Sequence, residues 1–275
     1  MRRRWVMVLA GAVVVLVAVA VALATGLVGG DDEPERELTR STPEETASGP
    51  VRAEFCDGVA DLEVALTQAP DDPAALGGYV AERITPAVAA VRGALPRDDA
   101  AADVEVVLAA VEQATASGDG TAFDTPDFAA AQARFYPYVA EACDYPLVTV
   151  TATDHAYAGF PATLKAGRAV LTLANTSESG ELHEIALVKL VPEATLPLEE
   201  FVALPPEEAA ALIDPASYGQ GVYAAPGETG GAVVELSAGR WVFACFVPTG
   251  TTDPAVEGTG PPHVANGMYG EVTVS

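Results

Sequence analysis

The chain has 275 residues, half of them apolar, and is long enough to bury two modest hydrophobic cores in addition to a targeting segment. Its 39 acidic residues outnumber its 14 basic residues and give a formal net charge of −25. A surface of this charge repels phosphate backbones, which argues against nucleic acid as a partner, and we interpret it as a solvated, soluble surface.

Residues 1–30 have the pattern of a membrane anchor. An arginine cluster follows Met1, and no charged residue occurs from Trp5 to Gly30. At about 1.5 Å rise per residue this run spans a bilayer, and the positive-inside rule places everything after it outside the cytoplasm. The sequence therefore predicts a single-pass transmembrane helix at the cell membrane, with the C-terminal domains extracytoplasmic. A signal peptide cleaved near Ala22-Leu23-Ala24, which would leave a secreted protein, is the alternative.

The next two segments differ in composition. Residues 31–50 are rich in Asp, Glu, Ser, Thr and Pro and are predicted to form a disordered linker, since they cannot bury a core. Residues 51–145 contain stretches in which apolar residues recur at spacings of three and four, separated by helix-breaking residues. We expect a small four-helix bundle, with its helices around Phe55 to Leu66, Leu76 to Val88, Val104 to Val111 and Phe128 to Val139.

The cysteines test this arrangement. Cys56 lies near the start of the first predicted helix and Cys143 at the end of the fourth, and these two ends lie side by side in an up-down-up-down bundle. An exported chain meets an oxidising compartment, so a Cys56–Cys143 disulfide is expected. A Cys143–Cys245 bridge, which would leave Cys56 free, is the alternative.

From Leu147 onwards the pattern changes to short strands punctuated by Gly and Pro. It predicts an antiparallel or mixed β-sandwich over residues 147–275, so the fold class is α + β with two domains after the anchor. An insertion at 192–231 contains a predicted helix at 198–213 followed by a Gly-rich loop. The strands are expected around Val148 to Val150, Ala169 to Ala174, Glu184 to Leu190, Ala232 to Leu236, Arg240 to Val247 and Glu271 to Val274.

The residues that carry chemistry lie in this last part. Cys245 has no partner if the other two cysteines pair, and two of the three histidines, His183 and His263, fall in the same region, with Met268 five residues after His263. A thiolate, two neutral imidazoles and a weak thioether are the ligands of a blue-copper centre. We therefore predict one copper ion bound by His183, Cys245, His263 and Met268. Burial of Cys245 as a small apolar residue is the alternative.

These residues resemble those of the cupredoxins, the plastocyanin- and azurin-like blue copper proteins. The resemblance covers about residues 147–275 and rests on the order His, Cys, His, Met, on the aromatic-rich strand before Cys245, and on the spacing of His263 and Met268 before a final strand. It implies a cupredoxin-like sandwich, three equatorial ligands and axial Met268. It also implies that His263 lies near the surface, within an apolar docking patch formed by Pro261, Pro262, Val264 and Ala265.

The sequence departs from the family in two places. Seventeen residues separate Cys245 from His263, whereas plastocyanin-like proteins join the two ligands by a short loop. Closing a longer loop costs little extra entropy, but it makes a rigid site less assured. In addition, Glu184 follows the first His, where many members have an Asn that braces the ligand loop.

The predicted function is that of a membrane-anchored, extracytoplasmic copper protein. It would transfer single electrons to or from a redox or copper-exchange protein in the cell envelope. Copper storage or delivery without redox turnover, and a metal-free interaction module, are the alternatives. We do not expect an enzyme, because three histidines are too few for a multicopper oxidase and the carboxylate pairs Glu199-Glu200 and Glu207-Glu208 point apart on a helix.

Overall fold

The computed structural model describes residues 49–70, 72–95, 99–118, 120–254 and 256–275. The predicted fold class needs correction at its first element. None of the helices in this part of the chain is long and apolar enough to cross a membrane. The predicted anchor at 1–30 lies outside the described residues, as does the predicted linker except for its last two residues, which begin the first helix.

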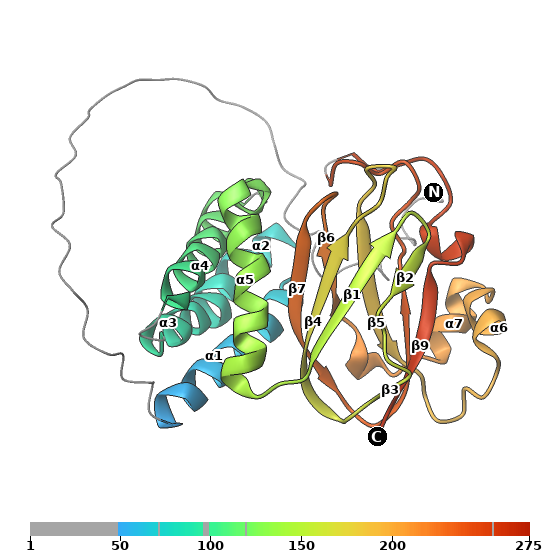
Figure 1. The fold of residues 1–275 in the computed structure, drawn as a ribbon, viewed down its shortest axis with the longest axis horizontal. Helices are drawn as coiled ribbons and strands as arrows, with labels where there is room; N and C mark the ends of the chain where they lie inside the picture. Colours follow the sequence, from blue (N-terminus) through green and yellow to red (C-terminus); the bar gives the residue numbers. More distant parts are fainter. Residues whose placement is uncertain (1–48, 71, 96–98, 119, 255) are drawn as a thin grey trace, which may run out of the picture.

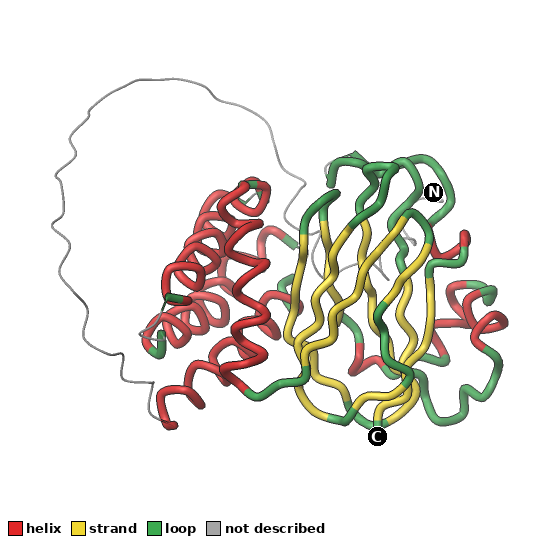
Figure 2. Tube along the Cα trace, viewed as in Figure 1, coloured by secondary structure: helices red, strands yellow, loops and turns green. Residues whose placement is uncertain are grey.

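Helices form a layer at one side of the molecule (Figures 1 and 2). The layer begins with α1 (Gly49–Thr67) and ends with α5 (Pro126–Cys143), whose N-cap is Thr125, its side chain accepting the Phe128 N–H. Between them lie α2 (Pro73–Tyr79), the π-helix η1 (Val80–Ile84), α3 (Thr85–Gly93), α4 (Ala100–Ser117) and the 3-10 helix η2 (Thr121–Asp124).

The predicted four-helix bundle is wrong as a description of this layer. The second predicted helix is divided by η1 into three segments, and the helices alone do not complete their core. Instead the helical core includes Val170 from the neighbouring sheet, and Val233 packs against it. The physical reason lies in the strand that carries Val170. Its residues 169–173 are all buried rather than alternately buried and exposed, so both faces of this strand are covered.

Two sheets form the sandwich. The first has the order β2-β1-β4-β7, with β1 (Leu147–Thr153) and β4 (Gly167–Asn175) parallel, so the sandwich is mixed. The second has the order β3-β9-β8-β5-β6. The remaining strands are β2 (Ala156–Ala158), β3 (Thr163–Leu164), β5 (His183–Lys189), β6 (Gln220–Ala224), β7 (Thr229–Leu236), β8 (Gly239–Ala244) and β9 (Tyr269–Val274). Their inward residues, including Trp241, Ile185 and Leu173, make one continuous core.

The segment predicted as an insertion differs from the expectation in detail. The predicted helix is two short ones, α6 (Leu198–Val202) and α7 (Pro206–Ala211), because Pro205 and Pro206 interrupt it. The predicted Gly-rich loop contains the 3-10 helix η3 (Pro215–Ser217) and the edge strand β6, which pairs with β5. A Cβ on Gly221 would lie 2.2 Å from the Ile185 carbonyl oxygen, so only glycine lets β6 approach β5 this closely. The same glycine makes the sequence of β6 resemble that of a loop.

Close contact joins the helices to the first sheet. Tyr136 of α5 lies against Gly231 of β7, where a Cβ would come within 2.2 Å of the ring. The Tyr136 hydroxyl donates to Glu63 of α1 at 2.6 Å. Glycine on the strand and tyrosine on the helix therefore fit as a pair, and α1, α5 and β7 meet at this point (Figure 1).

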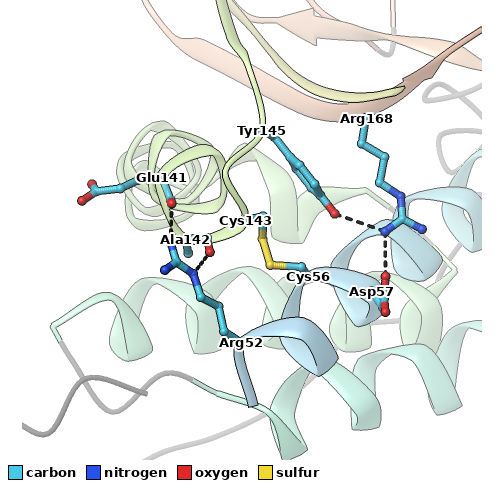
Figure 3. The surroundings of a disulfide bond; sticks show 8 residues. All are labelled: Arg52, Cys56, Asp57, Glu141, Ala142, Cys143, Tyr145 and Arg168. Carbon is cyan, nitrogen blue, oxygen red and sulfur yellow. Dashed lines mark hydrogen bonds and ion pairs between the residues drawn. A yellow bond between two sulfur atoms is a disulfide. The ribbon is translucent and has the colours of Figure 1, made fainter. Parts of the chain in front are cut away.

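A disulfide between Cys56 and Cys143 closes the helical layer, with its Cα atoms 5.6 Å apart (Figure 3). Arg52 donates from α1 to the carbonyl oxygens of Glu141 and Ala142, the last turn of α5. Arg168 of β4 donates to Asp57 at 2.7 Å and to the Tyr145 hydroxyl at 3.1 Å. The covalent bond and these hydrogen bonds fix both helix ends beside the first sheet.

The buried Glu63 predicts a pH dependence of stability. Burial raises the pKa of Glu63 to about 7, although Tyr136 and the Val233 N–H donate to its carboxylate. Because the folded pKa lies above the unfolded value of 4.5, the protonated form stabilises the fold below about pH 4.5, and this contribution is lost as pH rises through about 7. The loss amounts to at most about 3 kcal/mol, and Glu63→Gln should remove it.

The measurement is urea unfolding of the metal-free wild type and Glu63→Gln at pH 5 and pH 8. The variant should be more stable than the wild type at pH 8 and closer to it at pH 5. Glu184 also has a pKa raised to about 7 by burial, so the difference between the two proteins is the relevant quantity. A difference that is the same at both pH values would contradict the assignment.

Candidate metal centre

Three of the predicted ligands come together at one end of the sandwich. His183 begins β5, and Cys245 directly follows β8. The two strands are antiparallel neighbours, so both residues lie at the same end of the sheet. His263 begins the 3-10 helix η4 (His263–Asn266). Its N–H donates to the Val247 carbonyl at 3.0 Å, which holds the helix beside the chain that follows Cys245.

The donor atoms of these three residues form a compact group. All three residues have an exposed fraction of 0%, and one donor atom from each lies within 4.8 Å of the others. Cys245 Sγ is 3.3 Å from His263 Nδ1 and 3.9 Å from His183 Nδ1. Nitrogen and sulfur ligands at about 2.0–2.3 Å from one metal are separated by roughly 3.6–3.8 Å, so the observed spacing fits a single ion.

His183 has unusually few partners for a buried polar ring. Among the described residues, its Nε2 is one of two buried side-chain polar atoms without a hydrogen-bond partner. Its Nδ1 has the long contact with Cys245 Sγ. Burial of an unsatisfied polar group costs about 1–3 kcal/mol, so this ring is not buried for its hydrogen bonds. Its Nδ1 faces Cys245 Sγ and is the nitrogen placed to bind a metal. The ring therefore fits a metal ligand better than a structural residue.

The surroundings set the protonation of the metal-free group. Burial, and after it the neighbouring His263, lowers the pKa of His183 to about 4, and burial lowers the pKa of His263 as well. Burial raises the pKa of the Cys245 thiol to about 12. Both imidazoles are thus neutral near pH 7, as metal ligands must be, while the thiol would release its proton when a metal binds.

Met268 lies in the same region. It is fully buried, and Gly267, with φ +98°, turns the chain back from η4. Its N–H donates to the His263 carbonyl at 3.2 Å, and its carbonyl accepts the Cys245 N–H at 3.0 Å. The backbone thus joins Met268 to two of the three grouped residues, which is the neighbourhood that an axial thioether requires.

Glu184 braces the loop that carries Cys245, although many cupredoxins have an Asn at this position. Its backbone N–H donates to Cys245 Sγ at 3.5 Å, and its side-chain Oε1 accepts the Phe246 N–H at 2.9 Å. Tyr157 donates its hydroxyl to the Glu184 carbonyl. A glutamate therefore supplies the same kind of support as the amide side chain expected at this position.

Residues 246–254 and 256–262 are the described part of the long connection from Cys245 to His263, and they form an ordered hairpin rather than a loose loop. Pro248 and Pro262 form an isolated bridge, and Thr249 exchanges hydrogen bonds of 3.0 Å with Pro261 and Gly260. The hairpin also contacts the first ligand's strand, because Leu182 donates its N–H to Thr251 at 2.9 Å. Multiple backbone contacts therefore replace the rigidity that a short loop would give.

His263 is not at the surface, contrary to what the family resemblance implies. Its Nε2 lies 2.9 Å from Glu181 Oε2, and its ring centroid is 4.7 Å from that of His183. The exposed His155, in the turn between β1 and β2, lies with its ring centroid 5.4 Å away. The predicted docking residues beside it remain at least partly exposed, but the imidazole between them is covered.

Glu181 is the residue of this site that sequence reasoning missed. In extended chain, residues two apart point to the same side, so the spacing of Glu181 and His183 was the available signal. Its partner His263 lies 82 residues further along the chain. Only the fold brings the two together.

These observations define a β-sandwich with a buried Cys-His-His group beside a methionine. Several solved structures are similar to this chain. An auracyanin B has a TM-score of 0.31 at 20% identity, with 47% of this chain and 88% of that chain covered. Auracyanin from Roseiflexus castenholzii has a TM-score of 0.30 at 25% identity, with 47% of this chain and 96% of that chain covered. A multicopper oxidase from Pediococcus acidilactici has a TM-score of 0.27 at 14% identity, with 48% of this chain and 26% of that chain covered.

No protein-family model and no curated protein matches the chain. The resemblance of the C-terminal part to cupredoxins, predicted from the sequence, is confirmed by the grouped Cys and His residues at the end of the sandwich. The Met at the fourth predicted position lies beside this group.

Proposed function

We propose that this chain binds one copper ion through His183, Cys245 and His263, with Met268 as a weaker fourth ligand, and transfers single electrons. The observation that carries the proposal is the buried group of three donor atoms within 4.8 Å of one another. A soft thiolate with two imidazoles and a thioether suits copper, whereas the methionine position suits zinc less well.

Copper, when bound, would supply a one-electron couple between Cu(II) and Cu(I). The chain's own residues would supply a fixed ligand arrangement, because backbone hydrogen bonds hold Cys245, His263 and Met268 to one another. Burial would exclude water from all four residues. A rigid, dry site needs little rearrangement between the two oxidation states, which is the requirement for electron transfer without chemistry on a substrate.

The test is copper titration of the purified, metal-free full chain. We expect an intense blue absorption that saturates at one Cu(II) per chain, followed by a stable, reversible one-electron couple in voltammetry. Zinc at equal concentration should not displace the copper. A colourless protein that binds no copper would overturn the proposal, and copper binding without a reversible couple would favour storage or delivery.

We propose that the chain works in an oxidising compartment, with a redox protein as its partner. The Cys56–Cys143 disulfide supports this location, because such bonds persist outside the reducing cytoplasm. Alkylating intact cells before lysis tests it. Both cysteines should resist the reagent until reductant is added, whereas labelling without reductant would place the chain in a reducing compartment.

A further inference from the structure

Glu181 connects two parts of the metal centre through its two carboxylate oxygens. Its Oε2 lies 2.9 Å from His263 Nε2, and its Oε1 accepts the Gly250 N–H at 2.6 Å. The residue is 7% exposed. One buried carboxylate therefore holds both the second imidazole and the hairpin between Cys245 and His263.

The backbone of Glu181 is itself fixed. Its carbonyl accepts hydrogen bonds from the Asn175 side-chain amide at 2.8 Å and from the Ser177 hydroxyl at 3.2 Å. Asn175 is buried and also donates to Ala224 at 3.1 Å, which ties the turn to β6. The carboxylate is thus presented from a braced turn, and the geometry at His263 does not depend on a mobile side chain.

This contact decides which imidazole nitrogen is free. A carboxylate accepts hydrogen bonds and does not donate them, so His263 must carry its proton on Nε2. The lone pair then lies on Nδ1, the nitrogen 3.3 Å from Cys245 Sγ. A histidine that donates its second N–H to a carboxylate is held in one tautomer and orientation and becomes a stronger metal ligand.

We propose that Glu181 is a positioning residue for the metal centre: it fixes His263 with Nδ1 towards Cys245 and anchors the hairpin over that imidazole. The proposal rests on the copper function proposed above. It adds that the negative charge of Glu181, one imidazole away from the ion, favours Cu(II) over Cu(I) and lowers the reduction potential. It also explains why His263 is buried here.

The experiment compares Glu181→Gln and Glu181→Ala with Glu63→Gln, a control at a carboxylate of the helical layer that accepts from the Tyr136 hydroxyl and contacts no imidazole. The first readout uses metal-free full chain and needs no copper. Long-range proton–nitrogen NMR of His263 should show a single Nε2–H tautomer in the wild type and in Glu63→Gln. It should show a mixture of tautomers in Glu181→Ala.

The second readout uses the copper-loaded proteins. Copper affinity, measured against a competing chelator, should fall about 10–100-fold in Glu181→Ala. The reduction potential should rise in Glu181→Gln, which keeps the size of the side chain and removes its charge. Dispersed NMR signals of the helical layer verify that each variant is folded.

The two proposals fail separately. A single Nε2–H tautomer in Glu181→Ala, or unchanged affinity and potential in both Glu181 variants, would overturn the role of Glu181 while leaving copper binding intact. A wild type that binds no copper overturns the proposed function and the effect on potential, and the metal-free tautomers still decide whether Glu181 orients His263.

Discussion

Cys245→Ser should abolish the blue colour of the copper-loaded protein and lower its copper affinity by more than about 100-fold, the upper range for losing a mere supporting contact of a ligand. Cys245 Sγ lies 3.3 Å from His263 Nδ1 and 3.9 Å from His183 Nδ1. Serine has nearly the same shape, but its hydroxyl is a hard oxygen that stays protonated. The soft, negatively charged ligand that selects copper would therefore be lost with little change in packing.

The control for this experiment is the double variant Cys56→Ala/Cys143→Ala. It removes the remaining cysteines of the chain, and its colour should persist, since the disulfide lies in the helical layer and Cys245 in the sandwich. Absorption spectra and chelator competition of both proteins give the answer. A blue Cys245→Ser protein would show that the thiolate is not the ligand.

The same double variant should unfold far more easily than the wild type. The two cysteines are 87 residues apart, and closing a loop of this length in the unfolded chain corresponds to about 4–5 kcal/mol on the chain-entropy account. The bond also holds α1 and α5 at the point where Arg168 ties them to the first sheet (Figure 3). Its loss should therefore weaken the contact between the helices and the sandwich as well.

Urea unfolding of the metal-free proteins, followed by circular dichroism, measures this effect. Reducing the wild type should lower its stability by a similar amount, whereas Cys245→Ser should respond to reductant as the wild type does. A loss below about 1 kcal/mol in the double variant would mean that the unfolded chain is already compact or that the native bond is strained.

The Cys and His residues that group at the end of the sandwich could be singled out from the sequence because the chain contains so few candidates. With three cysteines and three histidines in 275 residues, pairing Cys56 with Cys143 left Cys245 conspicuous. Most strands of the sandwich could also be predicted from the sequence, because the alternation of apolar and polar residues within a strand is a local pattern. Such features depend on residues close together in the chain, where composition and period carry the information.

What the sequence did not reveal depends on contacts between distant segments. The glycines around β6, including Gly221, favoured a loop in the sequence analysis. Gly221 is needed because β6 passes close to Ile185, and this contact exists only once the two strands have paired. The burial of His263 depends on Glu181 and on the hairpin that starts at Pro248. The helices were predicted to pack among themselves, although the mostly apolar stretch 169–174 of β4, which contains Thr172 as its one polar residue, already signalled a strand covered on both faces.

The contact between Tyr136 and Gly231 limits which parts of this chain could be lost in evolution. The outer face of β4 and β7 is shaped for helices: Val170 is buried in their core, and a glycine makes room for an aromatic ring. A shortened gene that encoded only residues 147–275 would leave this face bare and prone to stick to other chains. The sandwich therefore depends on the helices to cover β4 and β7, and loss of the helices would first require polar residues on this face.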